Sequence, residues 1–339
     1  MADNTGIAWT DATWNPVTGC TKVSSGCKHC YAERDWGRLA RNPKATAYFG
    51  RSFTEVRVHP ERLEQPWHWK RPRRIFVNSM SDLFHEDVPE YFLDQVFAIM
   101  ALAPRHTFQI LTKRPERMHA YLDDRFDNRQ HAVGAAMLEY DAVRDGGFEV
   151  GGAHDAGLLE WPLSNVWLGV SVEDQGTADA RIPLLVNTPA AVRWVSAEPL
   201  LGPINMNEVP VGMFGPLRPH GGASPQTPRL GWVVVGGESG PHARLLNASW
   251  VRTLRNQCHA VDVPFFVKQL GAKFCDEQNG IAGAGLQVSI DDEYLVARRL
   301  YHRAGADPSE WAADLQVRQY PNPAAEGKDV AVPKWETGP

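Results

Sequence analysis

Three cysteines close together are the residues of this sequence best suited to chemistry. Cys20, Cys27 and Cys30 fall within eleven residues in the pattern C-x6-C-x2-C, and the chain contains only five cysteines. Three thiolates on one loop can hold a zinc ion or an iron–sulfur cluster and leave one coordination position open. An open position indicates a reactive site, because a fully ligated metal is usually structural.

The other candidate ligands do not decide which metal is bound. His29 could complete a Cys3His zinc site, but it lies directly beside Cys30, and adjacent ligands on one ion are sterically awkward. Cys258 and Cys275 stand alone in the sequence. They could contribute to a second cluster, although isolated cysteines are more typical of small buried apolar residues. From the spacing alone, a zinc ion, an iron–sulfur cluster and unligated thiols all stay open.

The composition indicates a globular chain with no overall attraction for nucleic acid. Its 339 residues are 43% hydrophobic, enough for one large domain or two smaller ones, and its formal net charge is −5. Nucleic-acid binding would therefore need a local basic patch. The polar N-terminus has no signal-peptide pattern, and no apolar run is long enough to span a membrane. Clustered cysteines are not typical of a secreted disulfide framework, so we expect a cytoplasmic protein with no membrane partner.

Short apolar runs alternate with helical stretches along most of the chain. The runs are rich in β-branched and aromatic residues, as parallel strands buried on both faces tend to be. Repeated strand–helix units of this kind predict a parallel α/β sheet or barrel. The predicted strands are residues 74–79, 107–112, 166–171, 192–196, 231–236 and 263–268. The predicted helices are at about residues 31–40, 89–102, 116–122, 178–186 and 247–260.

Polar side chains follow all six predicted strands at their carboxyl ends. Because these ends meet on one side of a parallel barrel or open α/β sheet, the side chains should line a common rim. A simpler alternative is that polar residues only mark where each strand leaves the core. Six strands in succession favour a binding or catalytic site. The polar residues are Asn78, Ser79, Ser81, Asp82, Thr112, Lys113, Arg114, Ser171, Glu173, Asp174, Ser196, Glu198, Glu238, Ser239, Lys268 and Gln269, with Gly237 directly before Glu238.

A short N-terminal strand within residues 7–14, the three-cysteine loop, a helix and repeated β-α units together resemble the radical S-adenosylmethionine (SAM) enzymes. The first cysteine gap is six residues here, whereas that superfamily usually has C-x3-C-x2-C. The resemblance implies a partial (β/α)6 TIM-like barrel of radical SAM type, with loop insertions and a small C-terminal extension. It also implies a [4Fe-4S] cluster on the three cysteines, SAM on the fourth iron, and an electron donor that reduces the cluster. Reductive cleavage of SAM then gives methionine and a 5′-deoxyadenosyl radical, which abstracts hydrogen from a substrate.

The sequence is more closely similar to the phage Gp37/Gp68 family, also called three-Cys-motif proteins (DUF5131). Seven blocks in the same order carry this resemblance over about residues 7–270. The family is poorly characterised, so the resemblance names no substrate. It implies a three-Cys-motif partner protein and, for a phage-encoded chain, the host cell cytoplasm. The blocks are WTDATWNPVTGC (9–20), NSMSDLFH (78–85), LTKRPER (111–117), WLGVSVED (167–174), SAEPL (196–200), GGESG (236–240) and VKQ (267–269).

The radical SAM resemblance suggests cofactor-binding roles at two strand ends. Asn78, Ser79 and Asp82 could accept hydrogen bonds from the SAM amine beside the cluster loop. Ser171 and Glu173, on a middle strand, are candidates for the ribose hydroxyls. The Gly-Gly-Glu motif that often serves the amine in that superfamily occurs here only at 236–238, too late in the chain to transfer the role by position.

Further strand ends supply candidates for catalysis. Lys113 could hold a carboxylate or a phosphate together with Arg114, although both could equally belong to an exposed helix start. His85 could transfer a proton, since an unperturbed histidine titrates near neutral pH, or it could make one structural hydrogen bond. The candidates for the substrate side of the rim are Glu198, Glu238, Lys268 and Gln269.

The chain divides at about residue 270. We expect a barrel domain over residues 1–270, with insertions at about 123–162 and 205–230, because both segments fall in connections where insertions are tolerated. Residues 271–321 should form a small C-terminal element, and residues 322–339 a disordered tail.

One basic stretch, residues 67–74, bears on the substrate. Trp67 and Trp69 alternate there with basic residues, which could contact phosphate and stack a base, or could form an exposed entry to a strand. The stretch and the phage-type resemblance suggest a nucleic acid or nucleotide as the substrate class. With the radical SAM resemblance, we expect a radical SAM enzyme that modifies or repairs such a substrate. Two alternatives stay open. One is a zinc-stabilised phage accessory protein that binds a partner without catalysis, and the other is a zinc-dependent hydrolase that uses the same rim.

Overall fold

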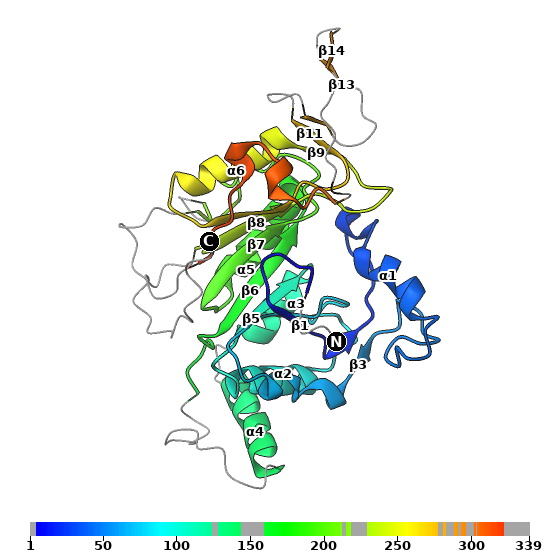
Figure 1. Ribbon diagram of the computed structural model, residues 1–339. Helices are drawn as coiled ribbons and strands as arrows, with labels where there is room; N and C mark the ends of the chain where they lie inside the picture. Colours follow the sequence, from blue (N-terminus) through cyan, green and yellow to red (C-terminus); the bar gives the residue numbers. More distant parts are fainter. Residues whose placement is uncertain are drawn as a thin grey trace.

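Seven parallel strands form the central sheet of the computed structural model, which describes residues 5–123, 128–143, 159–211, 215–217, 229–276, 281–282, 288–290, 293–295, 302 and 304–321. The strands follow one another across the sheet in chain order, and the sheet curls into a half-barrel (Figure 1). They are β1 (Ala12–Trp14), β4 (Arg74–Val77), β5 (Thr107–Thr112), β6 (Val166–Val172), β7 (Val192–Ala197), β8 (Trp232–Gly236) and β10 (Phe265–Gln269).

All six apolar runs of the sequence form strands of this sheet. Every residue of β6 and of β8 is buried, which explains why these runs show no alternation of polar and apolar residues. The prediction of a mixed α/β fold with a parallel, barrel-like sheet is therefore confirmed. The predicted N-terminal strand is shorter than expected, because only Ala12–Trp14 pair with β4 at the sheet edge.

Helices cover one face of the sheet. Apolar residues of α2, α3, α5 and α6 share a single core with the outward side chains of the strands. At the start of α5, Asp174 accepts a hydrogen bond from the Thr177 backbone (2.9 Å) and donates its own N–H to the Thr177 hydroxyl (3.0 Å). This capping box fixes the turn that leaves β6. The helices are α1 (Tyr31–Leu39), α2 (Glu90–Ala101), α3 (Pro115–Leu122), α4 (Asn128–Val143), α5 (Gln175–Asn187) and α6 (Ala248–His259).

Tryptophan side chains fill much of the inner face of the half-barrel. The ring centroids of Trp9 and Trp194 are 5.1 Å apart, and those of Trp194 and Trp232 are 5.3 Å apart. Gly169 of β6 makes room for this cluster, since a Cβ there would lie 2.4 Å from Cε2 of Trp194. Trp9 and Phe76 also border the cavity described below, so the aromatic cluster forms part of its wall.

Short elements complete the description. The small strands are β2 (Val17–Thr18), β3 (Arg57–Val58), β9 (Leu246–Asn247), β11 (Phe274–Asp276), β12 (Ile281–Ala282), β13 (Val288–Ile290) and β14 (Glu293–Leu295). The 3-10 helices are Ser25–Cys27, Pro60–Arg62, Gln65–His68, Pro308–Glu310 and Ala313–Leu315. No helix in the described part of the chain is long and apolar enough to cross a membrane.

The C-terminal residues 304–321 pack on the half-barrel. Trp311 and Leu315 are buried in the main core, and the Val267 N–H donates to the Val317 carbonyl (2.8 Å). The predicted tail at 322–339 lies outside the described residues. The same is true of 124–127, 144–158, 212–214 and 218–228 within the two predicted insertions.

Candidate functional site

A cavity of about 370 Å³ opens at the carboxyl ends of the strands, against the three-cysteine loop. Its volume is within the range typical of small-molecule sites. Eleven of the thirteen residues predicted for the site line it, while Glu173 and His85 lie outside its lining. The eleven are Cys20, Cys27, Cys30, Asn78, Ser79, Asp82, Lys113, Ser171, Glu198, Glu238 and Lys268.

The first half of the three-cysteine loop is fixed through its backbone. The Gly19 N–H donates to the Met80 carbonyl (3.2 Å), and the Cys20 N–H donates to the Phe53 carbonyl (2.9 Å). Gly19 has φ +91°, and a Cβ there would lie 2.2 Å from the Glu55 carbonyl oxygen. Only glycine fits this position, and it sets where Cys20 enters the cavity.

The second half of the loop passes close to Glu173. A Cβ on Gly26, in the 3-10 helix Ser25–Cys27, would lie 2.3 Å from Oε1 of that carboxylate. The Ser24 hydroxyl donates to the same oxygen (3.0 Å). Cys30 then stands at the N-cap of α1. The buried Glu173 carboxylate therefore helps to fix the path of the loop.

Glu173 itself lies behind the cavity wall. It is 0% exposed, and Nη1 of Arg181 donates to both of its oxygens (3.2 and 3.1 Å) and to the Ser171 carbonyl (2.6 Å). Nζ of Lys113 lies 3.8 Å from Oε1 and donates to the Ser171 hydroxyl (2.8 Å). These partners engage the carboxylate within the protein and leave the Ser171 hydroxyl at the cavity.

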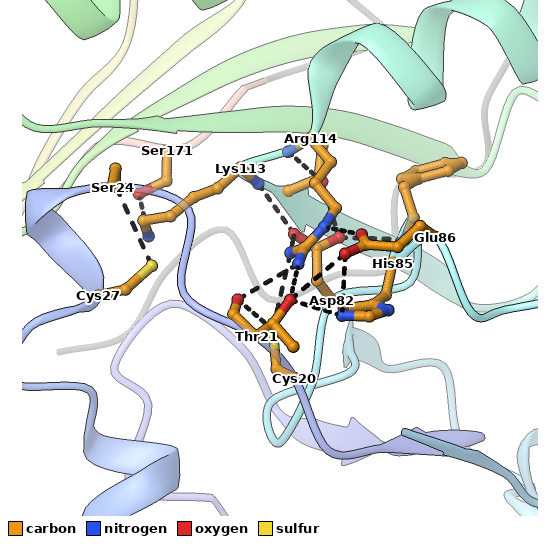
Figure 2. Close-up of polar contacts among 12 residues, drawn as sticks. Cys20, Thr21, Ser24, Cys27, Asp82, His85, Glu86, Lys113, Arg114 and Ser171 are labelled. Atoms are coloured by element: carbon orange, nitrogen blue, oxygen red, sulfur yellow. Dashed lines mark hydrogen bonds and ion pairs between the residues drawn. The ribbon is translucent and has the colours of Figure 1, made fainter. Parts of the chain in front are cut away.

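Asp82 lines the cavity but is also engaged by protein donors. Its Oδ1 accepts from the Thr112 hydroxyl (2.7 Å) and the Phe84 N–H (3.0 Å). Its Oδ2 accepts from the Lys113 N–H (3.0 Å) and from Nη1 of Arg114 (3.4 Å), as Figure 2 shows. Four donors around one carboxylate make Asp82 an anchor for the end of β5.

Arg114 brings positive charge to the first cysteine. Its Nη1 lies 3.7 Å from Sγ of Cys20, its Nε donates to Glu86 (2.8 Å), and its Nη2 donates to the Thr21 hydroxyl (2.8 Å) (Figure 2). Burial, followed by the negative charge of Asp82, raises the pKa of the Cys20 thiol to about 12 in spite of Arg114. A thiolate here needs further positive charge, which a bound metal would supply.

His85 contacts the loop and not the cavity. Its Nε2 lies 2.8 Å from the Thr21 hydroxyl, and its Nδ1 accepts from the Asp87 N–H (3.2 Å). Because Nδ1 accepts, the ring proton resides on Nε2. Burial, and then the charge of Arg114, lowers the pKa of His85 below its ordinary value. His85 is therefore a neutral ring that supports the loop at Thr21.

Glu198 and Lys268 form an acid–base pair on the cavity wall. Nζ of Lys268 donates to both Glu198 oxygens (2.7 and 2.9 Å), and Gln269 donates to Oε1 (3.1 Å). The Ser171 hydroxyl donates to the Glu198 backbone carbonyl (3.0 Å). The pair presents an ammonium donor and a carboxylate acceptor side by side, which suits a polar ligand.

Glu238 joins the rim to the cysteine loop. Arg244 donates to it from its backbone N–H (2.8 Å) and from Nε (3.0 Å), and also from Nη2. Burial acts to raise the pKa of Glu238, but the hydrogen bonds from Arg244 outweigh burial and hold the pKa below its ordinary value. Arg244 also donates to the Ser25 carbonyl (2.9 Å), so the two sides of the cavity are tied together.

Asn78, which lines the cavity, has an unpaired side-chain donor. The residue has φ +62°, its N–H donates to the Trp14 carbonyl (2.8 Å), and its Oδ1 accepts from the Val17 N–H (3.2 Å). Its buried Nδ2 has no hydrogen-bond partner among the described residues. A buried amide left unpaired costs free energy, so this position suits a ligand acceptor. Beside it, the Ser79 hydroxyl donates to Asn15 (3.1 Å).

Among the residues that hold the site, Ser24, Arg181 and Arg244 were not found from the sequence. A sequence pattern could have indicated the role of Arg181. This residue lies on the apolar stripe of α5 between Ala178 and Leu185, where a charge needs a buried partner. Ser24 and Arg244 lie outside the helices and strands, where no periodic pattern marks them.

The donor set fits an iron–sulfur cluster. Three free thiols line one cavity together with Lys113 and the unpaired amide of Asn78. In the described residues, no group of three or more His, Cys, Asp or Glu side chains is arranged to hold one metal ion. In a [4Fe-4S] cluster, each thiolate ligates a separate iron, so the ligands need not converge on one point.

Fold and cavity together define a mixed α/β protein with a thiol-lined site at the carboxyl ends of a parallel half-barrel. The family model described as "Protein of unknown function (DUF5131)" matches residues 4–318, and the chain belongs to this family. The family membership indicated by the sequence is thereby confirmed. No curated protein and no solved structure matches the chain.

Proposed function

We propose that this protein is a radical SAM enzyme that acts on a nucleic acid or a nucleotide. One observation carries the proposal: three cysteines of one loop line a cavity together with polar side chains from the strand ends of a parallel half-barrel. Cys20, Cys27 and Cys30 would hold a [4Fe-4S] cluster. When bound, the cluster would supply an electron for reductive cleavage of SAM and so start radical chemistry on a substrate.

The cavity residues suit the polar groups of SAM. Its carboxylate needs donors, which the unpaired Nδ2 of Asn78 and the Nζ of Lys113 can provide. Its amine needs acceptors, and the Ser79 hydroxyl has lone pairs available. The Ser171 hydroxyl is suited to the ribose. Asp82, in contrast, would position Arg114 beside Cys20 rather than bind the amine directly.

The Glu198–Lys268 pair would act on the substrate side. Lys268 can orient an anionic group, and the Glu198 carboxylate, held in place by Lys268 and Gln269, can accept a hydrogen bond from the substrate. Glu238 would keep the rim closed through Arg244 and Ser25. Glu173 and His85, outside the lining, would support the cysteine loop from behind.

Low-temperature EPR of the reduced, anaerobically reconstituted protein tests the proposal. We expect a [4Fe-4S]⁺ signal that changes when SAM is added and is absent in Cys27→Ala. Cys258→Ala is the matched control, because this thiol is buried in α6 and does not line the cavity. Formation of 5′-deoxyadenosine from SAM would then report turnover.

Stoichiometric zinc with no reconstitutable cluster would contradict the proposal. The three cysteines would then form a structural or hydrolytic zinc site. An EPR signal of the cluster that does not change when SAM is added would likewise exclude the radical SAM class, even if the cluster were stable.

A further inference from the structure

The segment that contains the cysteine loop and α1 is strongly basic. Residues 20–58 hold eight lysine and arginine residues against three acidic ones, a formal charge of +5 within a chain of −5. Three of these cations form ion pairs with the three acids. Lys28, Arg38, Arg41 and Lys44 are exposed, and no acidic partner for them occurs in the described ranges. The segment therefore presents unneutralised positive charge.

Arg34 and Arg38 lie on one face of α1, and Arg41 follows in the turn after the helix ends at Leu39; the three are called the arginine face below. Arg34, Arg38 and Arg41 are spaced i, i+4, i+7, while Ala32 and Trp36 form the opposite, buried face. Over seven residues this arginine face spans about 10 Å, roughly the rise of three stacked nucleotides. Figure 1 shows α1 (blue) set apart from the helices that cover the sheet.

The arginine face begins at the cavity. Arg34 lines the cavity, and its Nη1 donates to the Ser239 carbonyl (3.2 Å) in the loop that follows β8. Arg38 and Arg41 continue the same face away from the cavity. A chain of phosphates bound along α1 would therefore end at the cavity mouth.

An exposed aromatic ring lies near the far end of the arginine face. The side chain of Phe49 is 50% exposed, although it is a large apolar group. The Gly50 N–H donates to the Ala40 carbonyl (3.0 Å), which brings this loop back to the end of α1 beside Arg41. Cationic side chains next to an exposed ring are the combination with which proteins bind single-stranded nucleic acid.

The basic stretch at 67–74 is less suited to stack a base. Trp69 is only 8% exposed, and the Arg73 guanidinium lies 4.9 Å from its ring centroid. Arg74 forms an ion pair with Asp11 (3.0 Å). Lys70 and Arg71 are exposed, so this stretch retains charge without an available ring at Trp69.

We propose that the arginine face of α1 binds the phosphates of a single-stranded nucleic acid, that Phe49 stacks on one of its bases, and that a neighbouring nucleotide enters the cavity. The inference rests on the proposed function for the class of substrate. It does not depend on the cluster, because within the described part of the chain these side chains make no hydrogen bond to a cysteine thiol.

Fluorescence anisotropy of the full chain with labelled single-stranded DNA and RNA of about 12 nucleotides measures this binding. We expect Arg38→Gln/Arg41→Gln to weaken binding about tenfold at low salt. The slope of log Kd against log salt should fall by about 1.4, for two lost phosphate contacts. Phe49→Ala should weaken binding with the slope unchanged, because stacking releases no counterion.

Lys70→Gln/Arg71→Gln is the matched control, since it removes the same charge from the other exposed basic stretch. It should change the affinity less than about twofold. Both double variants alter exposed side chains, and equal thermal midpoints would show that folding is intact. Equal losses in the two double variants, or no loss in the α1 variant, would overturn the inference. Equal affinity for a polyglutamate probe would assign the face to an acidic polypeptide and overturn it as well.

The measurement is made before and after cluster reconstitution, which separates the two proposals. Salt-dependent binding through α1 in a protein that forms no cluster would keep this inference and remove the radical SAM function. If the cluster responds to SAM but the protein binds neither the DNA nor the RNA oligonucleotide, the radical SAM function is supported and the inference about α1 is overturned.

Discussion

At the residue scale, Glu173 shows how much of the cavity depends on a side chain outside it. Arg181 is the closest cation to this buried carboxylate, since its Nη1 donates to both carboxylate oxygens. We expect Arg181→Met to lower the free energy of unfolding by about 3–5 kcal/mol, because the buried carboxylate loses the cation that hydrogen-bonds to both of its oxygens. Urea denaturation measures this loss. In a Glu173→Gln background the same substitution should cost much less, since no charge remains there. A loss below about 1 kcal/mol in the single variant would contradict the assignment.

His106 makes the fold sensitive to pH far from the cysteines. Its ring is buried, its Nε2 donates to the Pro66 carbonyl (3.0 Å), and burial lowers its pKa to about 4 from an ordinary 6.5. Between these values the unfolded chain binds more protons, so stability falls as the pH falls from 6.5 to about 4. We expect this histidine to account for about 3 kcal/mol of that loss. Urea denaturation across this pH range should give a flatter profile for His106→Gln, and parallel profiles would refute the assignment.

The sequence predicted which residues gather at the cavity better than it predicted what each one contacts. Polar residues at strand ends must meet on one rim, so Lys113, Glu198 and Lys268 could be placed together. Glu173 was expected to bind the ribose hydroxyls and Asp82 the SAM amine, because both follow predicted strand ends and can accept hydrogen bonds. Their donors come from other elements of the fold, and no local pattern reveals such partners.

At the element scale, too, some features could be predicted from the sequence and others could not. Runs of four or more buried residues, such as β6 and β8, were predictable because burial on both faces leaves a continuous apolar run. The paired strands β2 and β3 have two residues each, too few for any periodicity to appear. Yet β3 pairs with the segment that leads into Cys20, so an element without a sequence signal helps to place the first cysteine.

The cysteine loop gives an element-scale prediction through Gly26. A methyl group there would meet the Glu173 carboxylate, so we expect Gly26→Ala to displace the loop, cost about 1–3 kcal/mol of stability, and lower the iron bound per chain after reconstitution. Gly37→Ala is the control, because no atom lies within 4 Å of its added Cβ and alanine favours the helix by about 0.5–1 kcal/mol. Iron and thermal midpoint are measured for both. Equal iron contents would show that the loop tolerates the methyl group.

At the scale of the whole molecule, the C-terminal segment and the half-barrel share one core. Arg252 of α6 donates to Asp276 (2.7 Å) and to Asp314 (2.8 Å), which joins the two parts. Nε1 of Trp232, from the inner tryptophan cluster, donates to the Gln319 carbonyl (2.9 Å). These contacts link residues more than twenty positions apart, so local composition carries no sign of them. For this reason the sequence alone could suggest a separate element after residue 270 but not its contacts with the half-barrel.

Removal of residues 303–339 tests this shared core. The truncation takes Trp311 and Leu315 out of the core, and each buried side chain of this size contributes about 2–5 kcal/mol. The summed loss approaches the total stability of a typical domain, about 5–15 kcal/mol, so we expect a chain without fixed tertiary structure. Near-UV circular dichroism and urea denaturation measure the outcome. A chain that ends at Pro321 keeps every contact named here and is the control. If the chain without residues 303–339 unfolded cooperatively at the same midpoint as the chain that ends at Pro321, the C-terminal segment would be an independent appendage. Its buried tryptophan would then add nothing to the stability of the half-barrel.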